Sequence, residues 1–219
     1  TSLVPVNGKL LIIENGVYGE RMTRIAERYA IPKSQVTNDW QAAIDYPAVA
    51  NALSADPTIT HIAVVHHETT TGRLNDLAPL AQLCREHNAS LLLDSVSSFG
   101  AEAIDFAGLP LAACAATANK CLHGVPGTCF VMVNRKALDD AHPRNLYLDL
   151  GAYVTAQDKQ GTPFTQSVQT FYALDEALNE LAEHGGIDSR RELYRSRMRR
   201  IRNSLLDLGI KPMLEEDET

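Results

Sequence analysis

The chain has 219 residues, of which 45% are hydrophobic and 21% are charged, and its formal net charge at pH 7 is −7. This composition is that of a globular protein, and the length suffices for one sizeable domain or one domain with part of another. No apolar run is long enough to cross a membrane, and so acidic a chain is not expected to bind nucleic acid over its general surface. We therefore predict neither a membrane nor a nucleic-acid partner.

The four cysteines give no sign of a disulfide framework or a zinc site. Their spacings contain no C-x-x-C pair, and no histidine joins them in a compact cluster. We expect reduced thiols in a cytoplasmic protein. The cysteines are Cys84, Cys114, Cys121 and Cys129.

Short apolar runs alternate with helical patterns over the first two thirds of the chain. Strands so apolar, separated by helices, predict an α/β fold with a mostly parallel sheet covered by helices on both faces. Asp76 is the expected N-cap of the third helix, because Pro79 then falls in its first turn. The predicted strands are 10–13, 61–65, 91–93, 111–116 and 129–133, and the predicted helices lie within 22–29, 47–53 and 77–84.

The pattern changes near residue 166, after which no strand is predicted. Apolar residues at helical spacing predict one helix over 168–181, ended by Gly185-Gly186, and another over 193–208, ended by Gly209. We divide the chain into a large domain, 1–165, and a linking helix with the start of a smaller domain, 166–219.

Seven arginines lie between Arg190 and Arg202. Such a run is typical of a solvated helix face or of charges with partners inside the protein, although a nucleic-acid or membrane role is conceivable. The acidic segment 215–218 is an obvious local partner.

Three polar clusters follow predicted strands, where ligands of parallel sheets bind. Asp94 directly follows three leucines, and this costly position indicates a turn cap, a structural ion pair or a functional carboxylate. Lys120 ends a run of small residues, and taken alone it reads as a surface lysine. Together, a lysine that condenses with carbonyls and a carboxylate that keeps a pyridine nitrogen protonated can hold opposite ends of pyridoxal phosphate. The clusters are 66–72, 94–100 and 117–127.

Adjacent histidines raise the question of a metal. Because neighbouring residues of a strand point to opposite faces, His66 and His67 are not expected to share an ion, and we predict no metal site. We expect one of the two to pack or to contact the cofactor ring.

Four segments together resemble the class V branch of the fold-type I pyridoxal-phosphate aminotransferases. Within that branch the likeness is greatest to the 2-aminoethylphosphonate–pyruvate transaminases. Ala-Asn-Lys-Cys followed by Gly-Val-Pro-Gly is the most specific part, and the likeness extends through nearly the whole chain. The segments are Asn15-Gly16-Val17-Tyr18-Gly19-Glu20-Arg21, His67-Glu68-Thr69-Thr70-Thr71-Gly72, Asp94-Ser95-Val96-Ser97-Ser98-Phe99-Gly100, and 118–121 with 124–127.

The resemblance implies a role for each matching residue. Lys120 would bind pyridoxal 5'-phosphate covalently, and Asp94 would pair with its ring nitrogen. Thr69 would contact the cofactor near its ring oxygen, Val96 would pack on one ring face, and Asn119 would lie near the phosphate. In a homodimer, Thr165 would reach the phosphate of the cofactor in the neighbouring subunit, and Thr162 matches the same segment less well.

The implied reaction moves the amino group of 2-aminoethylphosphonate to pyruvate, so the partners would be a small amino donor and pyruvate. An alanine–glyoxylate or serine–pyruvate aminotransferase of class V, and an inactive fragment that keeps the fold, are the alternatives. The family's phosphate-binding loop and its substrate-binding arginine have no match in the chain, which we therefore expect to be truncated at both ends. His67 stands in place of a cysteine, and Gly161 and Phe164 depart from a threonine-rich segment.

Overall fold

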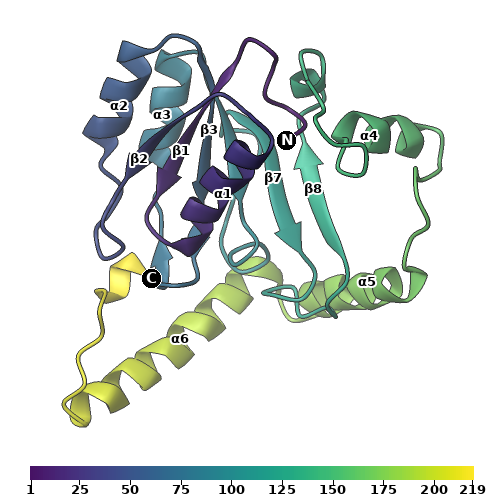
Figure 1. Ribbon diagram of the computed structural model, residues 1–219. Coiled ribbons are helices and arrows are strands. Elements are labelled where there is room, and N and C mark those ends of the chain that lie inside the picture. The colour runs from purple at the N-terminus through teal and green to yellow at the C-terminus, as the bar shows by residue number, and fades with distance from the viewer.

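A six-stranded sheet forms the centre of the computed structural model, which describes residues 1–219 (Figure 1). The strand order is β2-β1-β3-β6-β7-β8, and every neighbouring pair is parallel except β7 and β8. The predicted mostly parallel α/β fold is therefore confirmed. The strands are β1 (Lys9–Glu14), β2 (Lys33–Thr37), β3 (Ile59–Val65), β6 (Ser90–Asp94), β7 (Leu111–Thr117) and β8 (Cys129–Val133).

Helices cover the two faces of the sheet because its strands are apolar on both sides. In β1, Leu11 and Ile13 face a core cluster that includes residues of α2 (Tyr46–Ala55) and α3 (Ala78–Glu86). Leu10 and Ile12 face the opposite side, where α1 (Val17–Arg28) packs. Figure 1 shows α1 on one side of the sheet and α2 with α3 on the other.

All five predicted strands are present, but β2 was not predicted. Its sequence, Lys-Ser-Gln-Val-Thr, has a single buried residue, Val36, because β2 lies at the edge of the sheet. The prediction that Asp76 is the N-cap of α3 is wrong. The N-cap is Leu77, and the Asp76 carboxylate accepts a hydrogen bond from Ala78 N at 2.9 Å just outside it.

The C-terminal third contains three α-helices, α4 (Leu150–Asp158), α5 (Val168–Glu183) and α6 (Gly186–Asp207), and a short 3-10 helix, Glu216–Glu218. The two predicted helices correspond to α5 and α6, whereas α4 was not predicted. Gly185, with φ of 87°, adopts the left-handed backbone that separates α5 from α6. Both helices pass beneath the carboxyl ends of the parallel strands (Figure 1). No helix combines the length and the apolar character needed to cross a bilayer.

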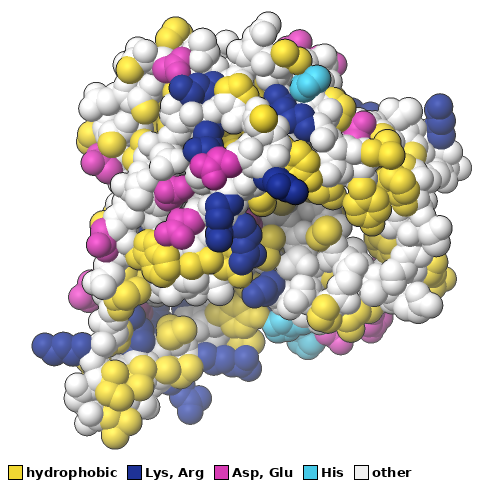
Figure 2. All heavy atoms as spheres, in the orientation of Figure 1, with side chains coloured by type: hydrophobic (Ala, Val, Ile, Leu, Met, Phe, Trp, Pro, Cys, Tyr) yellow, Lys and Arg dark blue, Asp and Glu magenta, His cyan; other side chains and the backbone are white.

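Helix α6 carries the arginine-rich segment. Figure 2 shows basic and hydrophobic side chains interspersed over this helix, so its surface is not a uniformly basic face. The exposed apolar side chains on α6 include Leu193, Met198 and Ile201. Arg199 pairs with Glu216 at 2.5 Å, and this contact confirms an intramolecular partner in the acidic segment.

Candidate active site

The carboxyl ends of β3, β6 and β7 bring the polar clusters together. Val65, Asp94 and Ala115 lie side by side across these three strands. The His67–Glu68 strand, β4, follows β3 and pairs with β5 (Arg73–Leu74). The turn that carries Lys120 follows β7, so all three clusters lie along one edge of the sheet.

Asp94 is the last residue of β6 and is half-buried. Its side chain accepts one hydrogen bond within the protein, from Val96 N to Oδ1 at 3.0 Å. Burial raises the pKa of Asp94, and the hydrogen bond from Val96 N opposes it in part. The Glu68 carboxylate raises this pKa slightly further and the Arg21 charge lowers it slightly. A cationic ligand group beside Asp94 would offset the cost of burying its ionised carboxylate.

Lys120 lies on the turn between β7 and β8, with an exposed side chain. Its amine makes no ion pair and lines a cavity of about 980 Å³. Thr69 and Ser97, from the two other clusters, line the same cavity. Their hydroxyl oxygens lie 2.6 Å apart. A primary amine free of partners is therefore presented to a space bordered by all three clusters.

Glu68 fixes the turn that carries Thr69. Its fully buried carboxylate accepts hydrogen bonds from Thr70 Oγ1 at 2.7 Å and from Tyr18 N, in the first turn of α1, at 3.3 Å. A carboxylate at a helix N-terminus is stabilised by the helix dipole. Gly16 permits this approach, since a Cβ there would lie 2.3 Å from Cγ and Cδ of Glu68.

The remaining predicted cofactor-binding residues occupy three different environments. Val96 is half-buried in the turn after β6, next to Asp94. Asn119 is exposed beside Lys120, and its Oδ1 accepts a hydrogen bond from Thr117 Oγ1 at 2.8 Å. Thr165 is exposed between α4 and α5, and it does not line the cavity that contains Lys120.

The two adjacent histidines differ in burial and in partners. His66 is buried, its Nδ1 lies 2.9 Å from Ser98 Oγ, and burial lowers its pKa to about 4. His67 is half-buried and lines the cavity, with Nε2 3.1 Å from the carbonyl oxygen of Gly72. His67 is thus the histidine available to a ligand.

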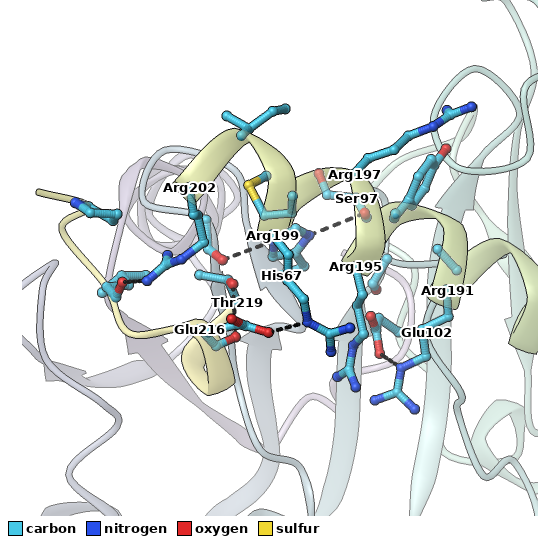
Figure 3. A pocket seen from close by; sticks show the side chains of 18 of the residues that line it. His67, Ser97, Glu102, Arg191, Arg195, Arg197, Arg199, Arg202, Glu216 and Thr219 are labelled. Atoms are coloured by element: carbon cyan, nitrogen blue, oxygen red, sulfur yellow. Dashed lines mark hydrogen bonds and ion pairs between the residues drawn. The ribbon is translucent and has the colours of Figure 1, made fainter. Parts of the chain in front are cut away.

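The opposite wall of the cavity is formed by α6 and the segment after it, which sequence reasoning did not connect with the site. Figure 3 shows Arg191 paired with Glu102 and Arg199 paired with Glu216, with Arg195 between them. The only available sequence signal was the density of arginines itself, because nothing in their spacing identifies a partner on another element. Five of them line the cavity: Arg191, Arg195, Arg197, Arg199 and Arg202.

Comparison with known families bears on this geometry. The profile of the class V aminotransferases matches residues 21–215, which include all three polar clusters. The chain belongs to the class V aminotransferase family.

Relatives in this family share sequence with nearly the whole chain. The chain is 36% identical over 219 residues to a 2-aminoethylphosphonate–pyruvate transaminase of Klebsiella pneumoniae, covering 98% of this chain and 60% of the relative. A transaminase of the same name from Vibrio vulnificus is 36% identical over 220 residues, again covering 60% of its length. The chain thus spans about three fifths of the length of these relatives.

Solved structures agree on the fold. An alanine–glyoxylate aminotransferase from a Nostoc species superposes with a TM-score of 0.90 at 24% identity, over 98% of this chain and 58% of its own. A pyridoxamine–pyruvate aminotransferase from Mesorhizobium loti gives a TM-score of 0.76 at 31% identity, over 84% of this chain and 48% of its own.

The class V aminotransferase family implies pyridoxal phosphate, and the residues of this site fit it. Lys120 offers an amine without a partner for covalent attachment, at a cavity large enough for a cofactor. Asp94 offers a carboxylate that accepts a single hydrogen bond within the protein and makes no ion pair, and the Arg21 charge has only a small effect on it. Thr69 and Ser97 add hydroxyl groups at the same cavity.

Proposed function

We propose that the protein is a pyridoxal-phosphate-dependent transaminase that moves the amino group of 2-aminoethylphosphonate to pyruvate, giving phosphonoacetaldehyde and L-alanine. The observation that carries this proposal is Lys120, an unpaired lysine at a cavity beside the strand that ends in Asp94. The choice of amino donor is supported by relatives of that name at 36% identity over nearly the whole chain.

The family resemblance gives each residue of the proposed site a role, and the positions of Lys120 and Asp94 at one edge of the sheet support theirs. The amine Nζ of Lys120 would hold the cofactor between turnovers, and when free it would move a proton at the substrate carbon. The Asp94 carboxylate holds a proton on the cofactor ring nitrogen. Thr69, Val96 and Asn119 orient the ring and phosphate. When bound, the cofactor supplies an electron sink for the pair of electrons left at that carbon.

The proposal extends to assembly and organisation. Residues 1–165 would form the cofactor-binding domain, and 166–219 the linking helix with the start of a smaller domain. In a homodimer, Thr165 would act at the site of the partner. Four free cysteines suit a reducing compartment such as the cytoplasm, where phosphonate catabolism would take place.

The donor is tested with the natural protein and added pyridoxal phosphate by following alanine formation when pyruvate is the acceptor and glycine formation when glyoxylate is the acceptor. We expect turnover with 2-aminoethylphosphonate that exceeds turnover with serine, and little transfer from alanine to glyoxylate. Turnover with alanine and glyoxylate but none with the phosphonate would reassign the protein to the alternative class V activity. Absence of any turnover, with the cofactor bound, would indicate an inactive fragment.

A further inference from the structure

The turn that carries Lys120 is not held by regular secondary structure. It is closed by two backbone hydrogen bonds, from His123 N to the carbonyl of Lys120 at 2.9 Å and from Gly124 N to the carbonyl of Ala118 at 2.8 Å. His123 has φ of 66°, a left-handed conformation that is unfavourable for a residue with a Cβ. The turn therefore needs support from elsewhere in the protein to keep one conformation.

Helix α6 supplies that support through Arg190. This arginine is only 8% exposed, and its Nη1 donates a hydrogen bond to the carbonyl oxygen of Cys121 at 2.7 Å. The contact fixes the residue that directly follows Lys120. A charged donor bound to a shielded carbonyl is among the stronger hydrogen bonds in proteins.

Tyr194 lies four residues further along α6, on the same face of the helix. Its hydroxyl contacts Nε2 of His123, and the two ring centroids are 6.0 Å apart. Arg190 and Tyr194 thus bind the turn on both sides of Leu122, and Tyr194 holds the strained residue itself.

The same region of α6 is tied to the turn after Asp94. Arg191 pairs with Glu102 at 2.9 Å, and Cys121 Sγ donates to the carbonyl of Ser97 at 3.3 Å. The elements that carry the proposed cofactor lysine and carboxylate are therefore joined to each other and to α6.

We infer that Arg190 is a positioning residue for Lys120, with Tyr194 as a second support. This inference rests on the proposed function for its chemical meaning, since the group being aimed is the cofactor amine. Helix α6 would then set the direction of Lys120 by holding the backbone on its C-terminal side. Arg190 itself does not line the cavity, so it acts through the turn and not on a ligand.

The first test needs no cofactor. Hydrogen–deuterium exchange of the peptide spanning 118–124 is compared in the wild type, Arg190→Met and Arg200→Met. Arg200 is an exposed arginine of the same helix that makes no ion pair and does not line the cavity, so it is the matched control. We expect Arg190→Met to speed exchange at His123 and Gly124 by roughly tenfold or more, the effect of losing one charged hydrogen bond, while Arg200→Met matches the wild type. Equal exchange in all three proteins would overturn the inference.

Two milder variants decide the matter if Arg190→Met does not fold. Tyr194→Phe removes only the hydroxyl that contacts His123, and Arg190→Lys keeps the charge. We expect faster exchange of the 118–124 peptide in Tyr194→Phe and intermediate exchange in Arg190→Lys. Wild-type exchange in both would overturn the inference.

A second readout separates this inference from the proposed function. With pyridoxal phosphate bound, the circular dichroism of the cofactor absorption band reports how the ring is held. We expect Arg190→Met to weaken that band at equal cofactor content and Arg190→Lys to restore it in part. An unchanged band would count against positioning. If the wild type bound no cofactor, the proposed function would fail, and exchange would still decide whether Arg190 orders the turn.

Discussion

The hydroxyl oxygens of Thr69 and Ser97 lie 2.6 Å apart, although 28 residues separate them in the chain. This contact joins the turn after β4 to the turn after β6 at the cavity that contains Lys120. It links the two clusters through side chains that a cofactor could also reach. The first prediction concerns this pair.

Removing the Thr69 hydroxyl is expected to weaken cofactor binding. Thr69→Val keeps the branched shape of the side chain and loses the hydroxyl that bonds with Ser97. We expect the loss of one hydrogen bond to raise the dissociation constant of pyridoxal phosphate about fivefold. Thr69→Ser keeps the hydroxyl and serves as the control. The dissociation constants are measured by absorbance titration, and equal values for the valine and serine variants would show that the hydroxyl has no such role.

Asp94→Asn is expected to stabilise the folded chain without cofactor, although it should remove most of the activity. Because the pKa of Asp94 is raised in the folded chain, ionising it opposes folding, and this cost is present at neutral pH and disappears as the pH falls below the raised pKa. Without cofactor, Asp94→Asn should therefore have a higher free energy of unfolding than the wild type at pH 7, and the difference should shrink in acid. Urea unfolding at a series of pH values measures it.

The same substitution should abolish most of the transamination activity. An amide cannot hold a proton on the cofactor ring nitrogen, and loss of such an electrostatic partner lowers the rate by at least about a hundredfold. Full activity of Asp94→Asn would remove Asp94 from the proposed site, whatever its effect on stability.

Acid sensitivity should arise from buried histidines. Burial lowers the pKa of both His66 and His61 to about 4, from the 6.5 that is ordinary for a histidine. The unfolded chain therefore binds these protons first, and stability is lost as the pH falls from 6.5 toward 4. Each histidine contributes a slope of about 1.4 kcal/mol per pH unit in that range.

Replacing either histidine should reduce this slope. His66→Gln and His61→Gln are each expected to lower the slope of the free energy of unfolding against pH by the contribution of one proton, about 1.4 kcal/mol per pH unit. The double variant should lower the slope by the contribution of two protons. Urea unfolding between pH 7.5 and 4.5 gives the slopes. An unchanged slope in the double variant would contradict the assignment.

A methyl group at residue 16 should strain the approach of α1 to Glu68. The added Cβ would lie 2.3 Å from two carbons of a fully buried side chain that cannot swing into solvent. Gly16→Ala is expected to cost about 1–3 kcal/mol in the free energy of unfolding. Gly161→Ala is the control, because its Cβ would meet its nearest atom at an ordinary 3.6 Å. Equal stability of the two variants would show that Glu68 relaxes.

The sequence predicted the parts of the fold that depend on local apolar patterns. The runs that became β3, β6 and β7 are apolar enough to identify strands buried on both faces, whereas β2 is too polar to stand out because it lies at an edge. The position of Asp94 at the end of β6 followed from the same reasoning.

The support of the Lys120 turn could not be predicted in this way. Arg190 and Cys121 are 69 residues apart, and their contact depends on the angle at which α6 returns beneath the sheet. That angle follows from the break at Gly185 and from packing between distant elements, not from any local pattern. The roles of Thr69, Val96, Asn119 and Thr165 came from the family resemblance, and they stay predictions.

The central claim is that Lys120 holds pyridoxal phosphate, and covalent trapping tests it most directly. The natural protein is incubated with the cofactor, reduced with borohydride, digested and analysed by mass spectrometry, beside Lys120→Ala. The account predicts a pyridoxyl phosphate group on the peptide that contains Lys120 and none in the variant. A protein that carries the group on another lysine, such as Lys136 or Lys159, or carries none, would contradict it.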